Sequence, residues 1–244
     1  MALQLDHVVI LVKDLEEAIK QYQKEGFKVS KGGRHDNGIT ENALIHFKDG
    51  TFLELLALRK RWKTHFIKLL FQIGYFKINS QSPRFGFQQR FVGKALYSLE
   101  GIMDFCLLAT TGEQDFLAIK QRNINTTHLT PMQRLKPDGQ LLRWKIFAPF
   151  SSYLPFVMTP YEPPFSPLPA NLEHSNGIQG IEKISVCVPE NEFEGAVRAY
   201  IQLLGKNPQN LTKAKALFRL ERGRIEIIKK QETHSSNFSI SYLL

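Results

Sequence analysis

The sequence has little cysteine and no long apolar run. Two of its 244 residues are cysteines, too few for a disulfide framework, so we expect a reducing, cytoplasmic environment. The amino-terminal segment lacks the basic region and the apolar length of a signal peptide, and no apolar run reaches the length of a membrane span. A Walker loop and the motifs G-x-G-x-x-G, C-x-x-C and G-x-S-x-G are also absent. Nothing in the sequence therefore indicates a nucleotide-binding site or a serine hydrolase.

Acidic residues are missing from one segment of the chain. The net charge is +9, from 32 Lys and Arg against 23 Asp and Glu, yet residues 55–99 contain no acidic residue. Basic residues in this segment account for the whole excess; they are Arg59, Lys60, Arg61, Lys63, Lys68, Lys77, Arg84, Arg90 and Lys94. An anionic partner is therefore expected at this segment rather than at the protein as a whole.

The same segment has the pattern of an amphipathic helix. Apolar residues recur at helical spacing from Trp62 to Phe76, with basic residues among them. We favour a lid whose apolar stripe packs on the rest of the protein. The alternative is binding of residues 59–77 to an anionic membrane surface. No nucleic-acid-binding module accompanies the charge, so we expect no nucleic-acid partner.

The rest of the chain repeats one order of predicted elements. An apolar strand at residues 5–12 is followed by a helix that ends at Gly26, a short strand, and two strands joined by a hairpin. The order β-α-β-β-β returns from Ile181 and, in weaker form, from Ile102. Two such units side by side can curve into a half-open barrel with the helices outside.

The predicted fold class is α+β, with repeated βαβββ units forming half-open, antiparallel-rich barrels. The predicted segments are a first unit (1–58), the basic insert (59–100), a second, divergent unit (101–160), a proline-rich linker (161–177) and a third unit with a C-terminal tail (178–244).

The order of these segments resembles a known family. LDHVVILVKDLEEAIK, GFKVSKGGRH and GTFLELLAL in the first unit, with RLKPDGQLLRW and HSNG further on, resemble glyoxalase-like domain proteins of the vicinal-oxygen-chelate superfamily. The resemblance covers nearly the whole chain except the basic insert. It implies a divalent metal at the barrel centre, bound by a His early in the first strand and a Glu in the last strand of each paired unit. It also implies a substrate with two neighbouring oxygens.

The resemblance assigns the metal ligands to three residues. His7 and Glu54 occupy the ligand positions of the first unit, and Glu226 occupies the last-strand position of the third. Imidazole and carboxylate ligands suit Zn²⁺, Ni²⁺, Mn²⁺ or Fe²⁺. Strand alternation places His7 and Glu54 on the side of the core residues, where a carboxylate needs a partner. A hydrogen-bonded His7–Glu54 pair without an ion also meets that need.

Five residues are candidates for substrate binding: His35, Asn42, Arg143, Trp144 and Lys183. His35 lies in a glycine-rich loop, which either carries binding groups at the barrel mouth or is a solvated turn. A buried Arg143 either binds a carboxylate or carbonyl group of the substrate or pairs with a carboxylate of the protein. Lys183 replaces the expected first-strand His of the third unit. It either supplies the missing positive charge or acts as a base in the cavity, or it lies on the solvent face.

Other residues have simpler interpretations. His46 and His174 show no metal-ligand spacing and are predicted to be structural or superficial. Cys106 is predicted to be a buried, inert thiol. The arginines near the last hairpin alternate, which indicates a solvated edge; they are Arg219, Arg222 and Arg224.

Two functions are compatible with these features. The first is a metal-dependent isomerase or lyase of the glyoxalase type, in which the metal polarises a small oxygen-rich molecule and Glu54 or Glu226 moves a proton. The second is a non-catalytic protein with a degenerate metal site that sequesters a small ligand. An odd number of units leaves one without an intramolecular partner, so we expect a homodimer.

Overall fold

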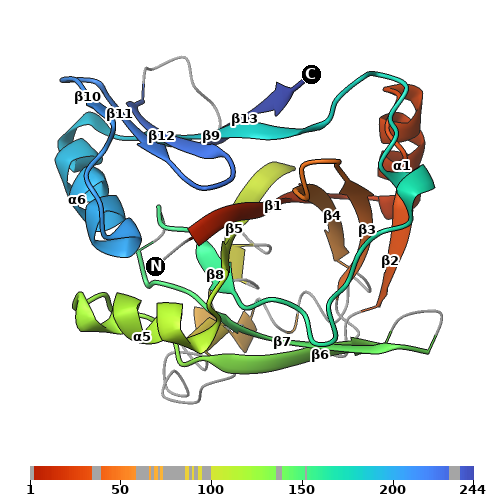
Figure 1. Ribbon diagram of the computed structural model, residues 1–244, viewed down its shortest axis with the longest axis horizontal. Coiled ribbons are helices and arrows are strands. Elements are labelled where there is room, and N and C mark those ends of the chain that lie inside the picture. Colours follow the sequence, from red (N-terminus) through yellow and green to blue (C-terminus); the bar gives the residue numbers. More distant parts are fainter. Residues whose placement is uncertain are drawn as a thin grey trace.

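A computed structural model describes residues 3–34, 40–58, 100–135, 139–151, 153–230 and 237–244. Within 59–99 it describes Phe66, Leu69, Leu70, Gln72, Ile73, Gly86, Phe87, Arg90, Gly93 and Lys94. The described residues form two β-sheets with helices around them (Figure 1).

The elements repeat the βαβββ order three times. In chain order they are β1 (Leu3–Val12), α1 (Leu15–Lys24), β2 (Ser30–Arg34), β3 (Thr40–His46), β4 (Phe52–Leu58), β5 (Gly101–Ala109), α5 (Glu113–Gln121), β6 (Thr130–Leu135), β7 (Leu141–Phe147), β8 (Phe156–Met158), β9 (Gly180–Val188), α6 (Phe193–Leu204), β10 (Asn210–Leu211), β11 (Lys215–Arg219), β12 (Arg224–Lys229) and β13 (Phe238–Leu243). Short 3₁₀ helices lie at Pro169–Asn171 and Glu190–Glu192.

The first two units share one curled sheet of eight strands, in the order β2-β3-β4-β1-β5-β8-β7-β6. Within each unit the first and last strands pair in parallel, and the two units meet where β1 pairs antiparallel with β5. Figure 1 shows the sheet curving from β2 through β1 to β6 and β7. The predicted α+β class with a half-open barrel is confirmed, and the first and second units are the pair that builds the barrel.

A β-bulge in β1 places two consecutive polar side chains together. Leu5 lies opposite Leu107 and His7 lies opposite Cys106, so Asp6 is the extra residue of the bulge. A bulge interrupts the regular alternation of side chains between the two faces of a strand. Asp6 is therefore able to lie beside the His7 ring, and both side chains are buried.

The third unit builds a separate sheet of five strands, in the order β10-β11-β12-β9-β13. Here β12 pairs with β9 in parallel, as β4 does with β1, and β13 pairs with β9 antiparallel, as β5 does with β1. The C-terminal strand thus takes the place that a second unit takes in the barrel. Because the third unit finds this partner within its own chain, the reason for expecting a homodimer no longer holds, and the oligomeric state stays a prediction.

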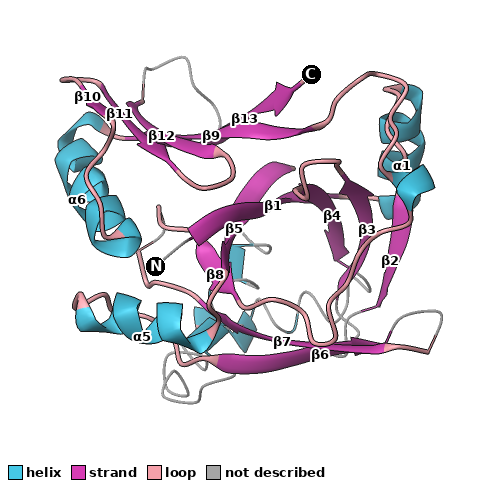
Figure 2. Cartoon of the chain, viewed as in Figure 1, coloured by secondary structure: helices cyan, strands magenta, loops and turns pink. Residues whose placement is uncertain are grey.

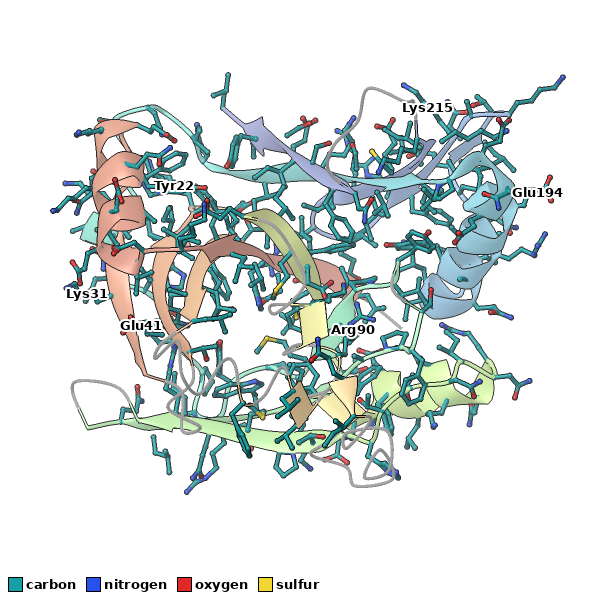
Figure 3. The ribbon with its side chains drawn as sticks, turned by 180° about the vertical axis from the view of Figure 1, so that it is seen from behind. Tyr22, Lys31, Glu41, Arg90, Glu194 and Lys215 are labelled. Carbon is teal, nitrogen blue, oxygen red and sulfur yellow. The ribbon has the colours of Figure 1, made fainter. Side chains whose placement is uncertain are left out.

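The two sheets pack over a common hydrophobic core. Fully buried residues of the barrel meet fully buried residues of the five-stranded sheet; examples are Leu53, Phe105 and Leu107 from the barrel, and Ile184, Val186 and Ile225 from the other sheet. The helices lie on the outside, with α5 near α6 and α1 at the other end (Figure 2). Figure 3 shows Glu194 and Lys215 at the periphery and Arg90 among packed side chains. No helix of the described residues is long and apolar enough to cross a membrane.

Most of the basic insert, including most of its predicted amphipathic helix, lies outside the described residues. Of the described part, Phe66, Leu69 and Ile73 are more than half exposed, at 58%, 51% and 64%. Phe87, in contrast, is buried in the inner face of the barrel, and Arg90 forms a salt bridge of 3.1 Å with Asp104 of β5. The described residues from 86 to 94 are thus attached to the barrel.

Candidate functional site

The hollow of the half-barrel is a cavity of about 1090 Å³. Its lining comes from both units and includes His7 of β1 and Glu54 of β4. His7 lies opposite Phe52 in the parallel pair β1–β4, and Glu54 follows Phe52 by two residues, so all three side chains face the same side of the sheet. The structure therefore brings together the imidazole and the carboxylate that the sequence predicted to meet.

The ring of His7 is held in one orientation. Its Nδ1 lies 2.7 Å from Oδ2 of Asp6. An ionised carboxylate only accepts hydrogen bonds, so Nδ1 carries the proton and donates it to Asp6. The other nitrogen, Nε2, lies 3.7 Å from Oε2 of Glu54. Phe52 stacks on the ring at a centroid distance of 4.3 Å, and Phe156 meets it edge-on at 5.4 Å. These contacts turn Nε2 of the ring toward Glu54 and the cavity.

Glu54 is positioned by Asn42 of the neighbouring strand β3. The amide Nδ2 of Asn42 donates a hydrogen bond of 2.6 Å to Oε1 of Glu54. Asn42 reaches this position because Gly32 on β2 leaves room: a Cβ at Gly32 would lie 2.2 Å from Oδ1 of Asn42. The three strands together hold a buried carboxylate at the cavity surface.

The second unit places sulfur atoms where the first unit places His7 and Glu54. Cys106 lies directly opposite His7. The strand partner of His7 is Phe52, and Glu54 follows it by two residues. In the same way, the strand partner of Cys106 is Phe156, and Met158 follows it by two residues. Both sulfur-containing residues are buried. Burial raises the pKa of the Cys106 thiol well above its usual value, so the thiol keeps its proton at neutral pH.

These residues give a divalent metal an incomplete set of ligands. Asp6, His7 and Cys106 offer ligand atoms within 4.8 Å of one another, but Asp6 is engaged with Nδ1 of His7 and the thiol is protonated. A catalytic zinc site uses three protein ligands beside its open position. Of this cluster and the adjacent Glu54, His7 and Glu54 are the two that remain; His46 also lines the cavity but does not belong to the cluster. The donor set therefore does not fit a resident divalent metal.

A positively charged residue, Arg134 of β6, lies in the same cavity. Its buried Nε has no hydrogen-bond partner among the residues that the structure describes. His46 lines the cavity near it; burial, and secondarily the charge of Arg134, lowers the pKa of His46 to about 4. Burial raises the pKa of Tyr161, which also lines the cavity. Both neighbours are therefore uncharged at neutral pH, and Arg134 supplies the positive charge in this part of the cavity.

The other predicted binding residues lie in different places. Asn42 and Trp144 line the cavity, and the Trp144 ring packs edge-on against Tyr161 at 5.2 Å. Arg143 also borders the cavity but its side chain is exposed, because neighbouring residues of a strand face opposite sides. The predicted pairing of a buried Arg143 with a carboxylate is therefore not found among the described residues. His35 lies outside the described part of the chain.

Lys183 and Glu226 are not brought to the cavity. They lie on β9 and β12 of the five-stranded sheet, where Nζ of Lys183 forms a salt bridge of 2.9 Å with Oε2 of Glu226. We correct the expectation that they share a site with His7 and Glu54, because the third unit does not complete the barrel. Their geometry is that of a partly buried ion pair.

Sequence reasoning missed Asp6, which holds His7, and two residues that line the cavity, Arg134 and Tyr161. The position of Arg134 could have been predicted from the sequence, because Thr130, Met132 and Arg134 are two residues apart along one strand and so share a face. Asp6 depends on a bulge, and Tyr161 lies in the segment predicted to be only a linker. Neither position follows from local periodicity.

The comparison with protein families agrees with this arrangement. A family model described as a glyoxalase-like domain matches residues 5–204. The chain belongs to this family. The match runs from β1 to the end of α6 and so spans the whole barrel. No curated protein sequence matches this glyoxalase-like protein significantly.

Solved structures show the same fold. A hypothetical protein from Staphylococcus aureus is 15% identical, with a TM-score of 0.71 over 94% of this chain and 87% of that chain. Other matches, with lower TM-scores, are methylmalonyl-CoA epimerases. A variant of the Streptomyces coelicolor enzyme, in complex with 2-nitronate-propionyl-CoA, is 15% identical with a TM-score of 0.40, over 65% of this chain and 96% of that one. The Mycobacterium tuberculosis enzyme is 16% identical with a TM-score of 0.39, over 64% and 85%.

Proposed function

We propose that this protein binds a small oxygen-rich molecule in the barrel cavity and that His7 and Glu54 transfer protons to and from it, as in an isomerase or lyase. The observation that carries the proposal is the Asp6–His7–Glu54 cluster at the cavity surface. Asp6 is hydrogen-bonded to Nδ1 of His7, so Nε2 is the nitrogen that faces the cavity and exchanges protons with the bound molecule. Glu54, 3.7 Å away, is a second proton carrier on the same wall.

The two groups are suited to a carbon acid, a molecule with a C–H bond next to a carbonyl group. One of them removes the proton from carbon, and the electron pair moves to the carbonyl oxygen to give an enolate. The same or the other group then returns a proton, at the original carbon for exchange or racemisation, or at the oxygen for isomerisation. Phe52 and Phe156 pack on His7 and limit access of water to this step.

The proposal does not include a resident metal, because the donor set is incomplete. The same feature supports a second candidate function, in which the protein sequesters a small ligand without changing it. In the second unit, Cys106 and Met158 occupy the two positions at which the family resemblance implies metal ligands. Aromatic side chains such as Trp144 border the cavity. The two functions differ in one property, which is whether a bound carbon acid exchanges its proton.

Proton exchange in D₂O separates the candidates. Suitable probes are 2-oxo-4-phenylbutanoate, its amide and 4-phenyl-2-butanone, with loss of the signal next to the carbonyl followed by ¹H NMR. We expect the wild type to accelerate exchange for at least one probe, also after chelator treatment. Glu54→Gln and His7→Phe are expected to slow exchange about 10²- to 10⁴-fold, the usual contribution of a general acid or base.

Glu194→Gln, which removes an exposed carboxylate on α6, is the matched control and should exchange at the wild-type rate. Binding of a probe without accelerated exchange would contradict catalysis and support sequestration. Exchange that persists unchanged in both cluster variants would contradict the roles of His7 and Glu54.

A further inference from the structure

We propose that the molecule bound in the cavity carries a carboxylate group, and that Arg134 binds this group. The inference rests on the proposed function and adds the chemical class of the substrate. It starts from a charge without a counter-ion: Arg134 lines the cavity, and no carboxylate among the described residues forms a salt bridge with it.

The state of the Arg134 side chain indicates a missing partner. Its Nε is buried and makes no hydrogen bond within the described residues. Leaving a buried charged donor unpaired destabilises a protein, so such donors are ordinarily matched by an acceptor. A carboxylate offers two coplanar oxygens that accept parallel hydrogen bonds from the two terminal nitrogens of a guanidinium. A ligand carboxylate therefore supplies the counter-ion that the described residues do not provide for this side chain.

The other charges of the cavity favour a group with a single negative charge. Asp6 is engaged with His7, and Glu54 with Asn42, so neither neutralises Arg134 directly. Both nevertheless contribute negative charge to the same cavity, whereas of the other cationic residues that line it Arg143 is exposed and Lys145 is paired with Glu113. A doubly charged phosphate would be repelled by them more strongly than a carboxylate, because the repulsion scales with the charge. One guanidinium thus matches one carboxylate.

The surroundings also indicate how the bound acid lies. His46 and Tyr161 are each within electrostatic reach of both Arg134 and Asp6, so the arginine and the His7 cluster belong to the same region of the cavity. Trp144 packs against Tyr161 on the same inner surface. A molecule held by its carboxylate at Arg134 therefore extends past aromatic side chains toward the proton-transferring groups. The substrate class is a small carboxylic acid with an apolar middle and a carbonyl or hydroxyl group at the reacting carbon.

Binding measurements test the inference without requiring turnover. The probes are 3-phenylpropanoate and 2-oxo-4-phenylbutanoate, each compared with its neutral amide, and Kd is obtained from ligand-observed NMR titration. The variants are Arg134→Gln and Arg134→Lys. Arg198→Gln is the charge-matched control, since Arg198 is 71% exposed on α6. Near-UV circular dichroism verifies that each variant is folded.

We expect the wild type to bind the acids at least about 10-fold more tightly than the amides, and Arg134→Gln to weaken acid binding about 10- to 100-fold while leaving amide binding within about 2-fold. Arg134→Lys should bind the acids with intermediate affinity, because it keeps the charge and loses the planar pair of donors. Arg198→Gln should match the wild type. Equal affinity for acids and amides, or acid binding that Arg134→Gln leaves unchanged, would overturn the inference.

The outcome is separable from the proposed function. Glu54→Gln should keep the acid-over-amide preference even though it slows proton exchange. A wild type that exchanges the proton of the amide as well as that of the acid would leave the roles of His7 and Glu54 intact and refute the carboxylate. A wild type that binds none of the four probes would refute both proposals for this class of molecule.

Discussion

Arg222 of the five-stranded sheet and Leu5 of the barrel exchange two hydrogen bonds. The N–H of Leu5 donates to the carbonyl of Arg222, and Nε of Arg222 donates to the carbonyl of Leu5, both at 2.9 Å. Nη2 of the same arginine lies 3.9 Å from Oδ1 of Asp6. Gly223, next in the hairpin, has a φ of +80°, and a Cβ there would lie 2.9 Å from Leu5. The second sheet thus holds the bulge that presents Asp6 and His7 to the cavity.

Replacing Arg222 should loosen this bulge. We expect Arg222→Ala to lower the free energy of unfolding by about 1–3 kcal/mol, through loss of the side-chain hydrogen bond and of the charge near Asp6. Urea unfolding measures this change. If Arg222 has a purely structural role, the stability is the one property that changes. A positioning role predicts in addition that the ¹⁵N shifts of the His7 ring change, because Asp6 no longer fixes the Nδ1 proton as firmly.

The control for this prediction is Arg219→Ala, which removes an exposed arginine close to the same hairpin. It should leave both the stability and the His7 ring signals as in the wild type. Arg222→Lys should restore part of the stability, because an ammonium keeps the charge and one donor. Unchanged His7 signals in Arg222→Ala would show that the arginine does not position Asp6.

This contact also shows what the sequence could predict and what it could not. The βαβββ order and the buried run of β1 follow from local periodicity, and the meeting of His7 with Glu54 follows from the family resemblance together with strand alternation. The docking of the Arg222 hairpin does not, because its alternating arginines have the pattern of a solvated edge. Which two units form the barrel is likewise decided by long-range strand pairing, which periodicity within one strand does not encode.

Gly32 should be required for the position of Asn42 and, through it, of Glu54. A Cβ at Gly32 would lie 2.2 Å from Oδ1 of Asn42, so Gly32→Ala displaces the amide that donates to Glu54. We expect a loss of about 1–2 kcal/mol of stability and slower proton exchange in D₂O, because Glu54 loses its hydrogen bond. The measurements are urea unfolding and the exchange assay.

The matched control is Gly195→Ala on α6, where a Cβ meets no atom within 4 Å. Alanine at this helical position should raise the stability by about 0.5–1 kcal/mol and leave exchange unchanged. If both glycine variants behaved alike, the contact between Gly32 and Asn42 would not matter for the site.

The stability of the protein should depend strongly on the two cationic partners of the buried Asp104. Its carboxylate is 1% exposed and forms salt bridges with Arg90 at 3.1 Å and Lys94 at 2.8 Å. Arg90 also donates to the carbonyls of Pro149, Ser151 and Leu154. We expect Arg90→Met to lower the free energy of unfolding by about 3 kcal/mol, since it leaves the carbonyls of Pro149 and Leu154 without this donor and the buried Asp104 with Lys94 as its one cationic partner among the described residues.

Arg198→Met provides the comparison, because Arg198 is 71% exposed and pairs with Glu194 at 3.6 Å on a helix surface. Such a surface pair contributes at most a few tenths of a kcal/mol, so the variant should unfold at nearly the wild-type urea concentration. A similarly small effect of Arg90→Met would mean that the described part of the insert is not held by Asp104.

His46 should make the stability of the protein fall on mild acidification. Burial lowers its pKa from the usual 6.5 to about 4, so the folded state keeps the ring neutral where the unfolded chain already binds a proton. Stability contributed by this difference is present above pH 6.5 and is lost as the pH falls toward 4. Between about pH 7.5 and about pH 5 the loss is about 2 kcal/mol.

His46→Gln removes the titrating group, so the unfolding free energy of this variant should fall by about 2 kcal/mol less than that of the wild type between these two pH values. Urea unfolding of both proteins at each pH measures the difference, and the values at the higher pH account separately for lost packing. Equal pH dependence of the two proteins would show that the imidazole is accessible to protons in the folded cavity.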